Sequence, residues 1–414
     1  MNEEKRENDI HSSPRGDLPR LNVKDLLLSL AAVLLCGCVL SGAIPSEWMS
    51  LASAILFVYT VIAVRNAGAV IQILLASLIV TGITFLPVGG AVVLALIHGT
   101  GTLAWLFMVL PKYKWAPIGL LAAAYGLGVL VTANAVAPLF ALAFLPAAVL
   151  MAWAHARDIG RTNTVLHTLL GFLIVALASL CVILWRTYGS INYDVLLGFV
   201  NELKTLFVTI TTEMSKMFWE TLEAVATPSA LASESWEEFR TVYETTFSES
   251  SLRQLADYFM GLAPALVGVP TLILSYLANV VLLRKYYNTE WRAQMTPAAC
   301  SLTVSPATGV IYFVCFLIAM FVEEQSVFLM AVSNMYFLLM PCLCLTGVNA
   351  ILQNARRARG WMGVTSILFL VAVVCCMGTG SFYFVALWGA YVTVSNALHQ
   401  KILQKMKEQD DNKN

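Results

Sequence analysis

Charged residues are scarce in this chain of 414 residues: Asp, Glu, Lys and Arg make up 12% of it, against about a quarter in an ordinary soluble domain. Hydrophobic residues make up 59%, which is more apolar surface than a water-soluble fold buries. Acidic and basic residues are equal in number, so the chain also lacks the overall positive charge that attracts nucleic acid. We expect a lipid bilayer around the chain and no nucleic-acid partner.

Catalytic motifs are also missing. The sequence contains no Gly-x-x-x-x-Gly-Lys phosphate loop, no His-Glu-x-x-His motif and no Gly-x-Ser-x-Gly motif. We therefore predict that the chain is not an enzyme and has no catalytic residue and no cofactor. One enzymatic interpretation remains, action on a lipid or isoprenoid carrier with His98 as base. Glu47, Glu323 and Glu324 are available near the membrane surface, but nothing in the sequence links them to His98.

The nine cysteines do not show the pattern of a disulfide-stabilised protein. None lies in the long polar segment 186–257, so we expect no disulfide framework. Cys36 and Cys38, and likewise Cys342 and Cys344, are spaced as soft-metal ligands can be, yet no His or carboxylate accompanies them. We interpret them as small packing residues and predict no metal site.

Apolar runs of membrane-spanning length recur along the chain, since roughly 20 helical residues cross about 30 Å of hydrocarbon. They lie at 26–44, 49–64, 69–86, 88–110, 117–136, 139–154, 164–185, 259–283, 304–322, 327–351, 362–377 and 382–398. Lys and Arg concentrate in alternate connections, which places those connections and both termini in the cytoplasm. The pairs at 69–110 and 362–398, joined by turns rich in Gly or Pro, either span fully or are re-entrant.

These runs predict an all-α fold, a polytopic transmembrane bundle of about 10–12 helices. The predicted parts are a polar cytoplasmic tail (1–25), seven spans (26–185), an external acidic segment (186–257), five more spans (258–399) and a second cytoplasmic tail (400–414).

The external segment carries an apolar stripe with steps of four and three, the spacing of one helical face. The stripe consists of Leu196, Val200, Leu203, Phe207, Ile210, Met214 and Met217. We predict an amphipathic helix that ends near Pro228 and a second helix that begins with a capping box, Ser235 to Glu238. These helices either lie over the bundle at the interface or form, at 194–247, a docking surface for a membrane or envelope protein.

Polar side chains inside the apolar runs are few, and each needs a partner because lipid offers none. We select His98, Asn134, Asn279 and Asn334 as candidate binding residues. His98 lies near the middle of its run, beside glycines that let a backbone or a ligand approach closely. It either serves a ligand or makes a hydrogen bond between helices. No charged residue falls well inside a run, which disfavours a proton pump built on a buried carboxylate.

Prolines inside the runs free backbone carbonyls, and they either line a substrate cavity or only kink their helices. They are Pro146, Pro264, Pro270 and Pro341.

Two stretches resemble a known family. The first, Phe144 to Thr162, is a Leu-Pro helix that ends in a basic turn. The second runs from Ala263-Pro-Ala-Leu through Tyr276-Leu-Ala-Asn to Leu283-Arg-Lys-Tyr, and Ser305-Pro306 opens the next run. Both resemble the YybS-like family of bacterial polytopic membrane proteins, which is grouped with the substrate-binding S components of energy-coupling-factor transporters. The resemblance implies a bacterial cytoplasmic membrane and a small ligand bound among the helices.

The sequence thus favours a solute-binding or transport-related membrane protein with a small-molecule ligand. The alternative is a membrane scaffold or envelope-assembly partner that docks through the external helices, residues 194–247.

Overall fold

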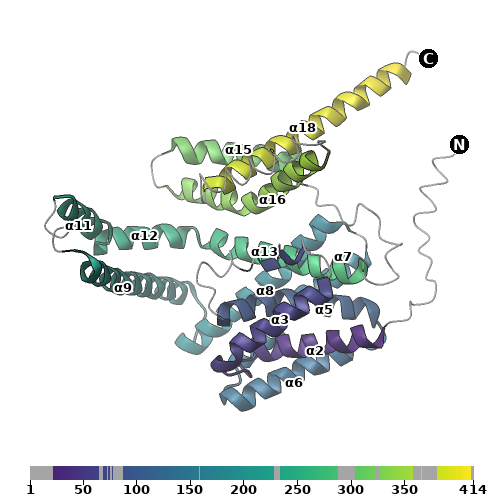
Figure 1. The fold of residues 1–414 in the computed structure, drawn as a ribbon, viewed down its shortest axis with the longest axis horizontal. Coiled ribbons are helices and arrows are strands. Elements are labelled where there is room, and N and C mark those ends of the chain that lie inside the picture. The colour runs from purple at the N-terminus through teal and green to yellow at the C-terminus, as the bar shows by residue number, and fades with distance from the viewer. Residues whose placement is uncertain are drawn as a thin grey trace. The chain divides into compact units, whose positions relative to one another are not determined.

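The structure is a computed structural model that describes residues 22–64, 69–71, 73, 74, 77, 87–157, 159–227, 234–287, 304–322, 326–357, 365 and 380–411. These residues form helices and no strand, which confirms the all-α fold (Figure 1). They divide into two compact units, residues 1–172 with 273–301 and residues 173–272 with 302–414.

Nine helical segments of the described chain are long and apolar enough to cross a membrane. The chain is therefore a multi-pass membrane protein. Most predicted spans form helices close to their expected bounds, but those at 69–86 and 362–377 lie largely outside the described residues. The nine include α9 (Tyr193–Val225), which we expected outside the membrane, and do not include α18 (Gly380–Asp411), which contains the last predicted span.

The first unit contains α2 (Val23–Leu40), α3 (Met49–Val64), α5 (Pro87–Val109) and α6 (Trp115–Thr132). Two 3-10 turns, η1 (Ser46–Trp48) and η2 (Ala137–Leu142), precede α3 and α7 (Leu145–Ala156). Helices α8 (Arg161–Tyr188) and α13 (Ala263–Tyr287) contribute their ends at 161–172 and 273–287.

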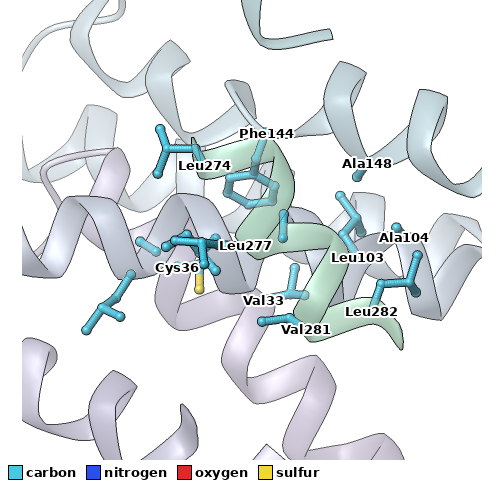
Figure 2. Close-up of a cluster of buried hydrophobic side chains, with 14 of the residues drawn as sticks. Val33, Cys36, Leu103, Ala104, Phe144, Ala148, Leu274, Leu277, Val281 and Leu282 are labelled. Carbon is cyan, nitrogen blue, oxygen red and sulfur yellow. The ribbon is translucent and has the colours of Figure 1, made fainter. Parts of the chain in front are cut away.

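Helix α13 lies at the centre of this unit's core because its residues in the unit are apolar on nearly every face. Figure 2 shows its leucines and valines among side chains from α2, α5 and α7. Small residues permit the close approach: a Cβ on Gly101 would lie 2.6 Å from the carbonyl oxygen of Ala278, and one on Gly99 would lie 3.0 Å from the ring of Phe144. The glycines beside His98 therefore serve helix packing.

The predicted end of the eighth span, at Leu283, falls short of the end of the helix. Helix α13 continues to Tyr287, and Lys285 near that end is only 9% exposed. A lysine at the end of an apolar helix ordinarily extends toward water, and tertiary packing prevents that here.

The second unit contains α9, α11 (Glu234–Thr246) and α12 (Glu249–Gly261), together with α15 (Pro306–Phe321), α16 (Val327–Arg357) and α18. Helices α15, α16 and α18 share a small core in which the rings of Tyr312 and Tyr336 stack at 4.8 Å. Gly347 on α16 and Gly389 on α18 lie where the two helices cross, since a Cβ on either would meet the backbone of the other helix.

Helix α9 confirms the predicted amphipathic helix, and its packing face overlaps the predicted stripe only in part: the ring of the stripe residue Phe207 lies 5.6 Å from the ring of Phe259 on α12. Lys204 forms an ion pair with Asp257 of α12 (2.6 Å), and the Tyr243 hydroxyl of α11 donates to the carbonyl of Ser215 (2.8 Å). Lys204 and Ser215 each follow a stripe residue by one position, so they lie about 100° around the helix axis from the stripe. Stripe members that remain exposed are Leu196, Ile210, Met214 and Met217.

Two predictions concerned single residues in or near helix ends: the capping box at Ser235 and the prolines inside the apolar runs. Helix α11 begins at Glu234, so Ser235 lies inside its first turn and does not form the expected capping box. Pro146 lies in the first turn of α7, and Pro264 lies in the first turn of α13, where proline fits a helix without breaking it. Pro270 and Pro341 lie inside helices.

Candidate functional site

A group of polar side chains is buried in the first unit where α2, α3, α5 and α13 meet. Helix α5 contributes three of them at steps of four and three, so they share one face of the helix. We call the group the polar cluster. It consists of Ser29, Tyr59, Thr60, His98, Thr102, Trp105 and Lys285.

His98 is fully buried at one end of the polar cluster. Its Nε2 lies 2.7 Å from the hydroxyl oxygen of Thr60, and that hydroxyl donates its single proton to the carbonyl of Leu56 at 2.8 Å. We therefore assign the ring proton to Nε2, which then donates to Thr60. The other ring nitrogen, Nδ1, has no hydrogen-bond partner among the described residues.

Tyr59 connects the two ends of the polar cluster. Its hydroxyl shares a hydrogen bond with Thr102 (3.1 Å), and its ring meets the His98 ring edge to face with centroids 5.1 Å apart. The same Tyr59 ring lies 5.1 Å from the ammonium nitrogen of Lys285. His98 and Lys285 thus face one aromatic ring.

Lys285 supplies the positive charge of the polar cluster. Its Nζ donates to the Ser29 hydroxyl at 2.6 Å, and Ser29 in turn donates to the carbonyl of Asp25 at 2.7 Å. The ammonium also lies 5.0 Å from the ring centroid of Trp105, so two aromatic rings contact it by cation–π interactions. No carboxylate of the described residues lies within 4.0 Å of Lys285, although Asp25 acts on its charge from farther away.

Hydrogen-bonding capacity is left over in the polar cluster. One of the three ammonium protons of Lys285 is donated to the Ser29 hydroxyl, and Trp105 Nε1 has no hydrogen-bond partner among the described residues. An unpaired buried group costs about 1–3 kcal/mol and a buried charge costs more, whereas each cation–π contact contributes about 0.5–2 kcal/mol. An excess of N–H donors around a buried cation is suited chemically to an anion.

A second polar group lies between α7, α8 and α13, on another face of α13. Asn279 Nδ2 is 3.4 Å from His155 Nε2, and Asn279 Oδ1 has no hydrogen-bond partner among the described residues. The guanidinium of Arg161 lies 5.0 Å from the ring centroid of Tyr276. This group is basic at its α8 end and has amide and imidazole groups at its centre.

The four residues selected from the sequence do not come together. His98 belongs to the polar cluster and Asn279 to the second polar group. Asn334 lies in the second unit, where its Nδ2 donates to the carbonyls of Gly261 and Met330 and its Oδ1 accepts from the Ala265 amide. Asn134 is exposed and caps the turn after α6 by accepting from the Val136 amide at 2.8 Å.

Sequence reasoning missed most of the polar cluster. Lys285 looked like an ordinary cytoplasmic lysine, and Tyr59 and Trp105 are single aromatics in apolar runs. The one available signal is the spacing from His98 through Thr102 to Trp105, which places three polar side chains on one helical face. Within the described residues, no three His, Cys, Asp or Glu side chains gather as metal ligands would.

Comparisons of the chain with protein-family models, with curated proteins and with solved structures find no match.

Proposed function

We propose that the chain is a solute-binding or transport-related membrane protein whose ligand is a small anion held at the polar cluster. The observation that carries the proposal is Lys285, a lysine that is 9% exposed and has no described carboxylate within 4.0 Å. A charged residue inside a membrane bundle commonly marks a substrate or ion pathway. The solute-binding role that the YybS-like resemblance implies is in accord with this proposal.

The geometry supports an anion over a cation or a neutral solute. Lys285 supplies a charge and unused N–H donors, and the indole N–H of Trp105 is a further unused donor. Two aromatic rings keep water from the ammonium, which strengthens its attraction for a negative charge. A carboxylate or a phosphate would satisfy these donors.

The proposed setting is a bacterial cytoplasmic membrane with both chain termini in the cytoplasm, which the distribution of Lys and Arg supports. Lys285 lies two residues from the end of α13, and Ser29 lies in the second turn of α2. Both positions belong to the end of the bundle that this rule assigns to the cytoplasm. The anion therefore meets the polar cluster nearer the cytoplasmic surface.

The test is a thermal-shift screen of the protein in lipid nanodiscs. The probes are acetate, lactate, succinate, glutamate, phosphate, sulfate and chloride, with choline, lysine and glucose as cationic and neutral comparisons. A bound ligand at 100 times its Kd stabilises the folded state by about 2.7 kcal/mol. We expect at least one anion, and no cation, to raise Tm. A response to choline, lysine or glucose alone would contradict the proposed ligand class.

A second candidate function, a membrane scaffold or envelope-assembly partner, is favoured by the exposed stripe on α9. Leu196, Ile210, Met214 and Met217 are each 39–66% exposed in the described chain. If this surface binds a protein, deletion of 194–247 should abolish co-purification of that protein and leave anion shifts unchanged. An unchanged set of co-purifying proteins would exclude the scaffold function.

A further inference from the structure

The Nδ1 atom of His98 is a buried acceptor that the proposed anion site leaves unused. The hydrogen bonds of Thr60 assign the ring proton to Nε2, so Nδ1 keeps a free lone pair. His98 is 0% exposed, and Nδ1 meets no donor among the described residues. An imidazole lone pair accepts a proton far more readily than a hydroxyl oxygen of Tyr59, Thr60 or Thr102 does.

The charge of Lys285 opposes a proton on His98. Both groups lie about 5 Å from the centroid of the Tyr59 ring, and Lys285 acts electrostatically on His98. A second positive charge in this apolar surrounding is unfavourable while Lys285 is unpaired. An anion bound to Lys285 would remove most of that repulsion, and a proton on His98 would in turn attract the anion.

Other titratable groups around His98 do not replace it as the proton acceptor. Tyr59 on α3 and Cys36 on α2 are neutral groups that can only lose a proton. Asp25 on α2 interacts with Lys285 and lies toward the helix end. Lys285 on α13 is assigned the positive charge of the polar cluster, and the Lys285→Arg variant tests whether Lys285 takes up the proton instead.

We propose that the polar cluster binds its anion together with one proton, which His98 Nδ1 accepts. This inference rests on the proposed anion-binding function and adds the proton as a second ligand. No bond other than the N–H bond forms: His98 becomes an imidazolium, and the incoming negative charge balances it. Because the two binding events are linked, each raises the affinity of the other by the same factor.

The experiment measures proton uptake during anion binding. The protein in nanodiscs is titrated with acetate, succinate and phosphate by calorimetry at pH 6, 7 and 8, each in two buffers of different ionisation enthalpy. We expect close to one proton taken up per anion bound, after correction for protonation of the anion itself. We also expect Kd to rise with pH, by up to about tenfold per pH unit.

Three variants identify the group that takes the proton. His98→Gln keeps an amide N–H for Thr60 but has no titratable nitrogen, so it should bind the anion without proton uptake. Lys285→Arg carries a charge that does not titrate, and Asp25→Asn removes the carboxylate; both should keep the uptake. Size-exclusion profiles and the Tm without ligand show which variants fold. If His98→Gln does not fold, Lys285→Arg and Asp25→Asn still test whether Lys285 or Asp25 takes up the proton.

Each outcome supports or overturns the inference. Anion binding without proton uptake in the wild type overturns it and leaves the proposed anion site standing. Uptake that persists in His98→Gln, or anion binding that continues without uptake in Lys285→Arg or Asp25→Asn, assigns the proton to another group and also overturns it. If no anion of the panel binds at any pH, the proposed function fails as well.

Discussion

Asn334 in the second unit and Lys285 in the first unit are both polar side chains placed among apolar helices, but they differ in what remains of their hydrogen-bonding capacity. Asn334 makes three hydrogen bonds of 2.7–2.9 Å, all to backbone atoms, and so ties α16 to the junction of α12 and α13. Lys285 makes one hydrogen bond to Ser29 and otherwise faces two aromatic rings. Burial of a polar group therefore does not by itself indicate a binding site, and the proposed site rests on the unused donors around Lys285.

The largest predicted effect is on binding. Lys285→Met replaces the ammonium by an apolar group of similar length, so anion affinity should fall roughly 100-fold, the value of a charged hydrogen bond of up to about 3 kcal/mol. Folding stability should stay the same or rise, because a buried ion is often replaced by a hydrophobic residue without loss. Anion titrations and thermal unfolding measure the two effects. Lys112→Met, which removes an exposed lysine, is the matched control and should bind normally.

Asn334→Ala should have the opposite pattern. It leaves one amide and two carbonyl groups of the backbone without their side-chain partner, and we expect a loss of roughly 2–4 kcal/mol in stability. Anion affinity should not change, because Asn334 belongs to the second unit. Tm measurements compare it with Asn134→Ala, which removes one exposed turn bond and should cost less. Equal effects in the two variants would contradict the structural role of Asn334.

Gly101→Ala tests whether the core that holds Lys285 depends on close packing. The added methyl group would lie 2.6 Å from the Ala278 carbonyl oxygen and 2.9 Å from Val281 Cβ, so we expect a cost of about 1–3 kcal/mol. Weaker anion binding should accompany it, because α13 must shift. Gly126→Ala on α6 meets nothing within 4 Å and should be neutral or stabilising by up to about 1 kcal/mol. If both variants had the same Tm, the close contact of α5 and α13 would be refuted.

Thr60→Val should give the smallest effect. It removes the acceptor for His98 Nε2 while it keeps the volume of the side chain, at a cost of about 1–2 kcal/mol for the unpaired imidazole N–H. The pH dependence of anion binding should shift, since the ring proton is no longer held on Nε2. Thr60→Ser keeps the hydroxyl and should restore the wild-type profile; a profile that Thr60→Val leaves unchanged would argue against the assigned tautomer.

The sequence predicted the helical class, most span positions and the long helix α9, because apolar run length and helical periodicity depend on local composition. It selected His98 as a candidate binding residue, and the structure places His98 in a buried polar group. It did not predict Lys285 in that group, because a lysine that follows Leu283 and Arg284 is typical of the cytoplasmic end of a span. The burial of Lys285 depends on contacts with α2, α3 and α5, which the sequence does not show. Asn279 and Asn334 both lie in apolar runs of the sequence, which does not distinguish them. Only tertiary contacts show that the Asn279 amide oxygen has no hydrogen-bond partner among the described residues, whereas the Asn334 amide is hydrogen-bonded.

Whether Lys285 binds an anion is tested by comparing the wild type, Lys285→Met and Lys112→Met in nanodiscs, each titrated with the anions of the thermal-shift panel. We expect at least one anion to raise Tm in a saturable manner for the wild type and Lys112→Met, and to have little effect on Lys285→Met at the same concentrations. An equal shift in Lys285→Met would show that Lys285 does not bind the anion.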